Sequence, residues 1–296
     1  MKKNSLGLAL VSVIMPVHNG SLFVEQAIES ILTQTYQNFE LIIVNDLSTD
    51  STPVIIERYR QLYPKKIKVI HLRKRHGAYG AANIAMRHAK GEFIAPMDAD
   101  DISHPKRFQK QVEFFLQNNE AIVVGTQARI IDEEGRIIGE KTFPTSRKEI
   151  YKKFLEVHPL VHPSCMIRRS LLPKKNRLYE NKYGVNDDYY TFFTLFKYGK
   201  IFNLPDYLLD YRIHLGNSSL QNLKQKFYNT VKIRLVAMIK LNYKPTIGGL
   251  AKLLGQTLLV TTLPESLLIN IYMIAKRIET PKRTKTSFSE RLAITN

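Results

Sequence analysis

Cysteine is almost absent from this chain of 296 residues, which has a single one, Cys165. One thiol cannot form an internal disulfide, so a disulfide-stapled secreted scaffold is excluded and a reducing compartment fits best. We expect Cys165 to behave as a small, buried apolar residue. Residues 1–10 lack both a long apolar core and a small-residue cleavage site, and we therefore expect no signal peptide there.

Acidic residues are scarce, with 26 Asp and Glu against 44 Lys and Arg and a formal net charge of +18. The excess is concentrated in residues 220–296, which contain 13 Lys and Arg but only 3 Glu. Such asymmetry indicates either an anionic partner, such as a nucleic acid or an anionic membrane surface, or a solvated basic face.

Long uninterrupted apolar runs are also lacking. The most apolar stretch, residues 253–275, is interrupted by Pro264 and Glu265, so we do not expect it to span a bilayer. Two interpretations remain for the basic region 220–296: amphipathic helices that lie on an anionic membrane surface, or a helical appendage packed on the preceding domain.

What the sequence does have is a regular alternation of short apolar runs and helix-period segments. Five runs are typical of buried strands: residues 11–15, 39–44, 67–72, 93–97 and 122–125. Four segments show helical spacing: residues 24–31, 55–62, 81–89 and 108–115. We expect Pro16 to end the first strand, Gly91 to cap the third helix and Pro105 to begin the fourth. The alternation predicts an α/β fold, with a mostly parallel central sheet and helices on both faces. A further helix is expected over residues 187–200.

Polar residues follow several of the predicted strands. His18 comes after the first, Asp46 after the second, and residues 98–101 (Asp-Ala-Asp-Asp) after the fourth. Ligands bind beyond the carboxyl ends of parallel strands, so these three segments should meet at one rim. Three neighbouring carboxylates repel one another unless a cation such as Mg²⁺ or Mn²⁺ shares them. The alternative is that Asp101 or Ser103 caps the following helix.

Each remaining candidate has a structural alternative. Asp46 can accept from a nucleobase N–H or close an Asx-turn. The neighbouring acids Asp187 and Asp188 suit either acid–base chemistry or the dipole of a helix that begins there. His162 and His214 are typical either of structural histidines or of metal ligands.

Six segments, in order, resemble the family 2 nucleotide-sugar glycosyltransferases, which are inverting enzymes with the GT-A fold. They are VSVIMPVHN (11–19), SILTQTYQNFELIIVNDLSTDST (30–52), GAYGAANIAMRHAKGEFIAPMDADD (77–101), VHPSCMIRRSLL (161–172), NDDYYTFFTLFKYG (186–199) and YRIHLGNSS (211–219). Together they extend over residues 11 to 219 and leave the last 77 residues outside the resemblance.

The resemblance implies roles for individual residues. The donor-binding positions that it implies are Pro16, Val17, His18, Asp46, Gly77, Asn83, Asp98 and Ala99. Among them, Asp46 would read the nucleobase, Asn83 and Gly77 would approach the diphosphate, and Asp98 would face the ribose. Asp100 and His214 would hold Mn²⁺ or Mg²⁺. Asp188 would be the general base, with His162 and Asp187 on the acceptor side.

It also implies the organisation and the activity. A GT-A domain would occupy residues 1–219, with a nucleotide-sugar half at about 8–125 and an acceptor half at about 126–219, followed by a basic amphipathic helical region, 220–296. The expected reaction moves a sugar from a nucleoside-diphosphate sugar, UDP-linked by default, to a glycan or lipid-linked acceptor in cell-surface polysaccharide assembly. The expected location is the cytoplasm, including the cytoplasmic face of the inner membrane.

Other functions stay open on the sequence. Leu47, Ala82 and Asp187 replace the family's usual Gly, Arg and Glu, so an inactive relative that acts as a regulatory binding protein remains an alternative. A nucleic-acid-binding protein fits the basic charge, but its phosphate partner would be repelled by the acidic strand ends, and we expect no nucleic acid partner. A nucleotidyltransferase would leave the motifs in residues 161–219 unexplained.

Overall fold

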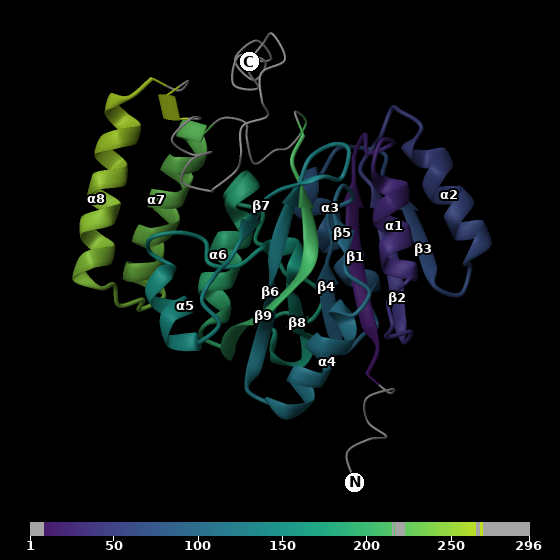
Figure 1. The fold of residues 1–296 in the computed structure, drawn as a ribbon, viewed down its shortest axis with the longest axis horizontal. Coiled ribbons are helices and arrows are strands. Elements are labelled where there is room, and N and C mark those ends of the chain that lie inside the picture. Colours follow the sequence, from purple (N-terminus) through teal and green to yellow (C-terminus); the bar gives the residue numbers. More distant parts are fainter. Residues whose placement is uncertain (1–8, 215, 217–222, 265–266, 269–296) are drawn as a thin grey trace.

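The first four strands of the sheet are parallel, as the apolar runs predict. β1 (Val11–Val17), β2 (Phe39–Asn45), β3 (Ile67–His71) and β4 (Phe93–Pro96) lie in the order β3-β2-β1-β4. The structure, a computed structural model, describes residues 9–214, 216, 223–264 and 267–268 (Figure 1). β1 continues through Pro16, which was wrongly expected to end it. Pairing of β1 with β4 stops at Ile14, so the N–H that Pro16 lacks has no partner to lose on that side.

Five further strands complete a nine-stranded, mixed sheet: β5 (Ile102–Ser103), β6 (Ala121–Ile131), β7 (Ile137–Lys141), β8 (Met166–Arg168) and β9 (Lys200–Arg212). β8 lies antiparallel between β4 and β6, whereas β6 and β9 pair in parallel. β5 and β7 are antiparallel to β9 and β6. The parallel arrangement is thus confirmed for the first half of the chain, while the second half mixes both directions.

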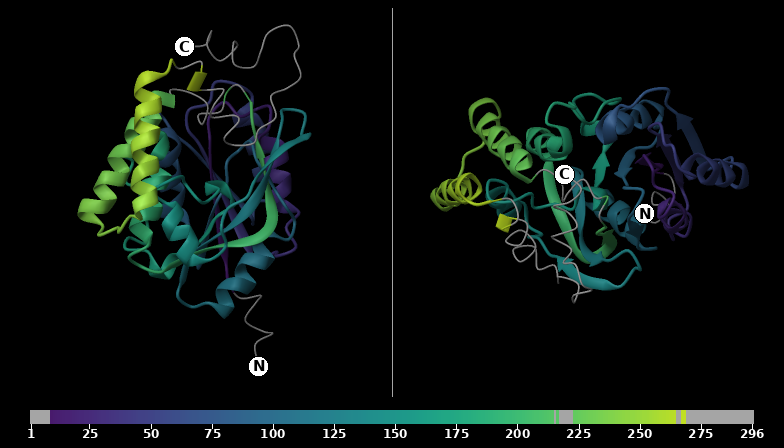
Figure 2. Two further views of the ribbon diagram at one scale, coloured as in Figure 1. Left: turned by 60° about the vertical axis from the view of Figure 1, so that its left-hand side comes forward. Right: turned by 90° about the horizontal axis from the view of Figure 1, so that it is seen from above.

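Helices cover both faces of the sheet, as predicted. The α-helices are α1 (Val24–Leu32), α2 (Thr52–Leu62), α3 (Gly77–His88), α4 (Arg107–Gln117), α5 (Arg147–Lys153), α6 (Asp187–Leu195), α7 (Leu223–Lys240) and α8 (Ile247–Thr262). One buried cluster joins α1, α2 and α4 to Val13 and Met15 of β1. The second joins α3, α5, α6 and α7 to Ile14 of the same strand (Figure 2). Alternating residues of β1 therefore enter two separate cores.

Several predicted boundaries were wrong for identifiable reasons. α4 begins at Arg107 rather than Pro105, and α6 ends at Leu195 rather than continuing to residue 200. Gly91 does not cap α3, whose cap residue is Ala89. Gly91 instead lies against β1, where an added Cβ would stand 2.6 Å from both the Leu10 oxygen and the Ser12 nitrogen. Its small size serves close backbone approach rather than helix termination.

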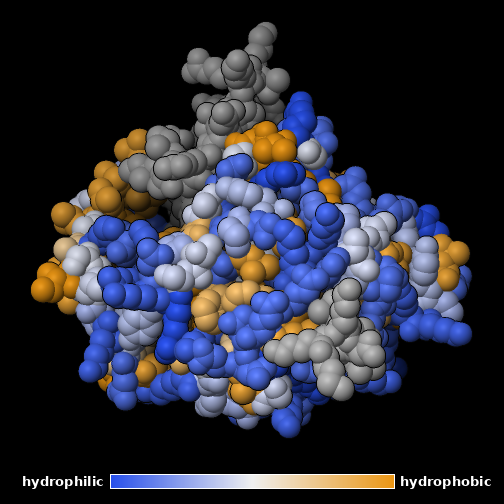
Figure 3. Space-filling view, turned by 60° about the horizontal axis from the view of Figure 1, so that its bottom comes forward, coloured by the Kyte–Doolittle hydropathy of each residue, from blue (hydrophilic) through white to orange (hydrophobic). Residues whose placement is uncertain are grey.

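The C-terminal region begins with two helices, as expected for residues 220–296. α7 buries Ile233 and Ala237 in the same core cluster as α6, and α8 lies outside α7 (Figures 1 and 2). Within the described residues, no helix has both the length and the apolar character that crossing a bilayer requires. Part of the apolar stretch 253–275 lies outside the described residues. Apolar side chains gather at the left margin of Figure 3, where α8 is located.

Candidate active site

A cavity of about 1720 Å³ opens at the carboxyl ends of β1, β2 and β4, where the sequence predicted that polar segments would meet. Ten of the predicted residues line it: Pro16, Val17, His18, Asp46, Asp98, Ala99, Asp100, His162, Asp188 and His214. Gly77, Asn83 and Asp187 are not among its lining residues. The cavity also takes in residues that the sequence did not single out, among them Arg75 on the loop before α3.

Asp46 is almost fully buried, and its carboxylate bonds to the main chain. Its two oxygens accept hydrogen bonds from the backbone N–H groups of His76, at 2.8 Å, and Gly77, at 2.9 Å. The Nε of Arg75 lies 3.5 Å from Oδ2. These bonds span about thirty residues, so Asp46 does not form the Asx-turn that was its alternative. It fixes the loop that enters α3, and Gly77 fits there because its φ of +71° suits a residue without Cβ.

Two residues in the loops after β1 and β2 adopt left-handed backbone conformations. Asn19, after β1, has φ of 49° and Leu47, after β2, has φ of 60°. The Asn19 side-chain oxygen accepts a hydrogen bond from the Thr49 N–H at 2.8 Å, which ties the two loops together. A left-handed conformation costs an L-residue roughly 1–2 kcal/mol. This backbone conformation is the physical reason to expect a glycine at the position that Leu47 occupies.

Asp98, Asp100 and Asp101 form a carboxylate cluster whose potential ligand atoms lie within 4.8 Å of one another. Burial, reinforced by the charges of Asp100 and Asp188, raises the pKa of Asp98 to about 7. Burial, reinforced by the charges of Asp100 and Asp98, also raises the pKa of Asp101. Asp101 Oδ2 is buried without a hydrogen-bond partner among the described residues. A hard divalent cation fits this set of oxygens, because it would relieve both the mutual repulsion and the unpartnered oxygen.

His214 and Arg212 support this cluster from β9 and the segment after it. His214 Nε2 lies 2.9 Å from Asp100 Oδ2. Arg212 is 1% exposed, donates from its backbone N–H to Asp101 Oδ1 at 2.9 Å, and donates from Nε to the Asp100 carbonyl. Sequence reasoning missed Arg212, although it lies two residues before His214 in a matched motif.

Neither Asp101 nor Ser103 caps α4, which was the alternative to a metal-binding role. The residue at the helix N-cap is Lys106, which makes no side-chain capping bond. Asp101 faces the carboxylate cluster, and the Ser103 hydroxyl oxygen accepts a hydrogen bond from Gln34 at 3.1 Å. The acids at 98–101 are therefore gathered by the strand end rather than by the next helix.

Asp188, in the first turn of α6, lines the cavity. Its Oδ1 accepts from the Tyr189 N–H at 2.7 Å, and its Oδ2 lies 3.8 Å from His158 Nε2. Its side chain is 18% exposed, which leaves it open to the cavity. Burial raises the pKa of Asp188, with a smaller opposing effect from His162. A carboxylate with a raised pKa is a stronger base, so Asp188 is suited to accept a proton.

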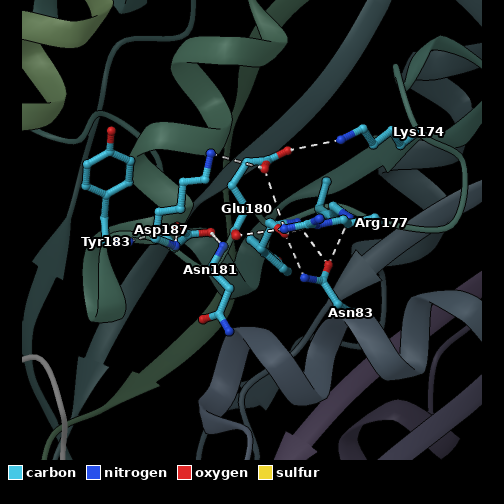
Figure 4. Close-up of polar contacts among 10 residues, drawn as sticks. Asn83, Lys174, Arg177, Glu180, Asn181, Tyr183 and Asp187 are labelled. Carbon is cyan, nitrogen blue, oxygen red and sulfur yellow. Dashed lines mark hydrogen bonds and ion pairs between the residues drawn. The ribbon is translucent and has the colours of Figure 1, made fainter.

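Its neighbour Asp187 has a different task. It is fully buried, and its carboxylate accepts hydrogen bonds from the backbone N–H groups of Asn181, Lys182 and Tyr183, at 2.8 to 3.2 Å. These bonds fold the loop that leads into α6 (Figure 4). Asp187 therefore holds the loop before α6 in place without lining the cavity.

Asn83, expected at the diphosphate, bonds to protein backbone instead. Its Oδ1 accepts from the N–H groups of Leu178 and Tyr179, both at 3.0 Å, and its Nδ2 donates to the Tyr179 carbonyl at 2.7 Å (Figure 4). Asn83 thus fastens the segment that leads to α6 onto α3. Its observed contacts give it a structural role that the family resemblance did not imply.

His162 lines the cavity among aromatic rings. Its Nε2 is 2.6 Å from the Tyr179 hydroxyl, and the Tyr79 ring lies edge-on to it. Burial lowers the pKa of His162 to about 4, so the imidazole is neutral near pH 7. No metal-binding group of three residues includes it among the described residues.

Comparison with known proteins agrees with this geometry. Residues 12–174 match the model of the family described as Glycosyl transferase family 2. An uncharacterized glycosyltransferase of Haemophilus influenzae is 34% identical over 227 residues, which cover 73% of this chain and 69% of that protein. The O-antigen biosynthesis glycosyltransferase WbnJ of Escherichia coli is 33% identical, over 79% of this chain and 90% of that protein.

Two solved structures have a similar fold. S. aureus TarS 1-349 in complex with UDP has a TM-score of 0.61 at 20% identity, covering 78% of this chain and 65% of that chain. The mannosyltransferase PcManGT of Pyrobaculum calidifontis, in complex with GDP-Man and Mn²⁺, has a TM-score of 0.56 at 18% identity, covering 90% of this chain and 79% of that chain. At these identities the likeness shows the fold alone, which is the GT-A fold.

Proposed function

Because the chain belongs to glycosyl transferase family 2, we propose that it is an inverting enzyme that takes its sugar from a nucleoside-diphosphate sugar. The observation that carries the proposal is that Asp188 and the carboxylate cluster of Asp98, Asp100 and Asp101 line or border one cavity. UDP is the first choice of nucleotide, because the TarS structures contain UDP and UDP-GlcNAc.

The donor would occupy the part of the cavity at the carboxyl ends of β1, β2 and β4. Pro16, Val17 and His18 form the wall suited to the base, and Arg75 is a cation near Asp46. Asp98, Asp100, Asp101 and His214 would hold Mn²⁺ or Mg²⁺, as the Mn²⁺ in the PcManGT structure supports. Such an ion, when bound, neutralises the negative charge of a leaving diphosphate.

The acceptor would approach from the side of α6. Its hydroxyl oxygen attacks the anomeric carbon, the bond from that carbon to the diphosphate oxygen breaks on the opposite face, and the hydroxyl proton passes to the Asp188 carboxylate. The configuration at the anomeric carbon is thereby inverted. One carboxylate suffices, because a nucleoside diphosphate leaves as an anion and needs no protonation, unlike the alkoxide released by a glycosidase.

The acceptor class that we propose is a glycan or lipid-linked saccharide of cell-surface polysaccharide assembly, which the name of WbnJ supports. Proximity to an anionic membrane surface fits such an acceptor. The helix α8 supports this placement, since Ile247, Leu254 and Leu258 are 88%, 72% and 65% exposed. The basic residues of region 220–296 would complement the anionic headgroups of a cytoplasmic leaflet.

A thermal-shift panel of UDP, GDP, ADP and CDP, each with Mn²⁺ or with EDTA, tests the donor proposal. A nucleotide at a hundred times its dissociation constant stabilises by about 2.7 kcal/mol, which raises the Tm of a chain of this size by roughly 4–5 °C. We expect the largest shift with UDP and Mn²⁺ and little shift with EDTA. If no nucleotide gives a Mn²⁺-dependent shift, the proposal is wrong.

A further inference from the structure

One arm of the cavity runs past Asp188 between α6 and the helix pair α7 and α8, outside the segments that resemble the family. One face of α7 lines it, because Lys226, Thr230 and Arg234 recur every four residues. Gln256 and Leu259 of α8 line the opposite side. The arm is therefore built largely by the C-terminal region, which the donor and base sites do not use.

Arg234 is a charged residue that lines this arm, and it is 3% exposed. Its Nε donates to the Tyr189 hydroxyl at 3.1 Å, and its Nη1 donates to Gln256 Oε1 at 2.9 Å. Both partners are neutral. The Tyr189 hydroxyl in turn donates to the Phe154 carbonyl, so its proton is already committed and its oxygen is left to accept.

No carboxylate among the described residues forms an ion pair with the Arg234 guanidinium. Glu156, which also lines the cavity, forms ion pairs with two lysines instead. Its Oε2 lies 2.7 Å from Lys252 Nζ and 3.2 Å from Lys153 Nζ. Removing a guanidinium from water is unfavourable by several kcal/mol unless an anion compensates it. Neutral hydrogen bonds compensate only in part, so Arg234 is suited to a ligand that brings a negative charge.

The same arm has a second cation and an apolar wall. Lys226 is half-buried, and burial lowers its pKa to about 8. Phe227, Val260 and Leu268 line the arm alongside these cations. A purely ionic ligand would gain nothing from such a wall, whereas an apolar chain attached to the anion would.

We propose that this arm binds the acceptor through a phosphate or diphosphate joined to an apolar chain, with Arg234 as the anchor of the anion and the chain against α7 and α8. The inference rests on the proposed function and narrows its acceptor to an amphiphilic phosphate ester. Tyr189, which bonds to Arg234, directly follows the proposed base Asp188 in α6. A saccharide carried by the anchored phosphate would therefore lie next to the base.

Farnesyl diphosphate is the probe for this proposal, with inorganic pyrophosphate and farnesol as the anionic and apolar parts alone. Binding to the full chain is measured by calorimetry in EDTA, so that a metal at the carboxylate cluster does not contribute. We expect farnesyl diphosphate to bind at least 10-fold more tightly than either part. Arg234→Gln should weaken its binding at least 10-fold, and Lys226→Gln should weaken it about 3-fold. The matched control Lys232→Gln, at an exposed position of the same helix, should stay within 2-fold.

Titration of each variant with UDP and Mn²⁺ separates the possible failures. If UDP binds normally while Arg234→Gln leaves farnesyl diphosphate binding unchanged, the anchor is wrong and the proposed function survives. Equal affinity for pyrophosphate and farnesyl diphosphate would overturn the proposal that the ligand carries an apolar chain, because the apolar wall would then contribute nothing. If the wild-type chain binds no nucleotide, the proposed function itself fails. If Arg234→Gln loses UDP binding because it misfolds, Lys226→Gln becomes the deciding variant. Farnesyl diphosphate binding to Lys226→Gln that equals binding to the wild type would then reject the site.

Discussion

The acidic side chains of the site differ in what surrounds them, and this difference separates structural acids from reactive ones. Asp46 and Asp187 accept hydrogen bonds from backbone N–H groups, so their charges are satisfied within the protein. Asp98 and Asp188 have raised pKa values, since burial outweighs the favourable contacts available to them. Asp98 and Asp188, whose pKa values are raised, are therefore suited to binding a cation or a proton.

His162 gives a pH prediction at the residue scale. Its folded pKa of about 4 lies below the ordinary value of 6.5, so the unfolded chain binds the proton more readily. The contribution of the neutral imidazole to stability is therefore complete above pH 6.5 and is lost as the pH falls toward 4. Urea unfolding of the wild type should show a free energy of unfolding that falls by about 1 kcal/mol per pH unit more steeply across this window than that of His162→Gln.

The matched control is His104→Gln, which removes an exposed histidine. It should keep the wild-type slope between pH 6.5 and 4. Identical slopes for His162→Gln and the wild type would show that burial does not hold the His162 imidazole neutral.

At the residue scale, the sequence predicted where the site lies better than it predicted the contacts of each residue. Residues that follow buried strands, such as His18, Asp46 and Asp98, were found because strand ends converge in any parallel sheet. The contacts of Asn83 were not predictable, because its partners at 178–179 lie in a loop about ninety-five residues away. Arg234 lay outside every matched motif, so only the packing of α7 against α6 could reveal it.

At the scale of elements, the segment from Lys174 to Asp187 leads from the region after β8 into α6, which carries Asp188. Asn83 holds it from α3, and Asp187 holds it from the start of α6. The carboxylate of Glu180, in the same segment, lies near three cations (Figure 4). Its oxygens are 3.6 Å from Lys174 Nζ, 3.5 Å from Arg177 Nη2 and 3.9 Å from Lys182 Nζ. These exposed ion pairs contribute little individually, so the buried bonds of Asn83 and Asp187 should dominate the order of the segment.

Asn83→Ala should therefore lower the free energy of unfolding by about 1–3 kcal/mol, because it leaves the N–H groups of Leu178 and Tyr179 without an acceptor. Asn83→Asp keeps that acceptor but places an oxygen against the Tyr179 carbonyl where the amide donated a hydrogen bond, so it should also destabilise the fold, and less so at a pH low enough to protonate the new carboxyl group. Denaturant unfolding measures both. We also expect Asn83→Ala to retain affinity for UDP with Mn²⁺, and a large loss would return Asn83 to the diphosphate-binding role.

The sequence predicted long elements better than short ones. β1 to β4 and their helices were found because each repeats its apolar period over several residues. β5 and β8 contain two and three residues, too few to display a period, and β8 is the strand that reverses direction between β4 and β6. The mixed half of the sheet was missed for this reason.

At the scale of the whole molecule, α7 and α8 combine three features on one side: an apolar exposed surface, a basic composition and one wall of the cavity. A membrane-bound acceptor would use all three together. This arrangement predicts that the chain binds anionic vesicles through α8 and that apolar contact is needed as well as charge.

Co-sedimentation with vesicles of phosphatidylglycerol, compared with vesicles of phosphatidylcholine, measures this binding. The wild type should sediment with the anionic vesicles, and the double variant Leu254→Ser, Leu258→Ser should bind at least 5-fold more weakly. The matched control Leu62→Ser removes an exposed leucine from α2 and should bind as the wild type does. Equal binding of all three proteins would assign the attraction to charge alone and reject α8 as the contact.

The most direct test of the central claim compares chemistry with donor binding in Asp188→Asn. The readout is release of UDP from the UDP-sugar that binds best, with water as the acceptor, beside calorimetric titration of UDP with Mn²⁺. General-base catalysis contributes about 10²–10⁴-fold, so UDP release should fall at least 100-fold. The dissociation constant of UDP should stay within about 3-fold, and Asp206→Asn, whose carboxylate pairs with Lys110 outside the cavity, should match the wild type in both readouts. Turnover of Asp188→Asn near the wild-type rate would contradict the account.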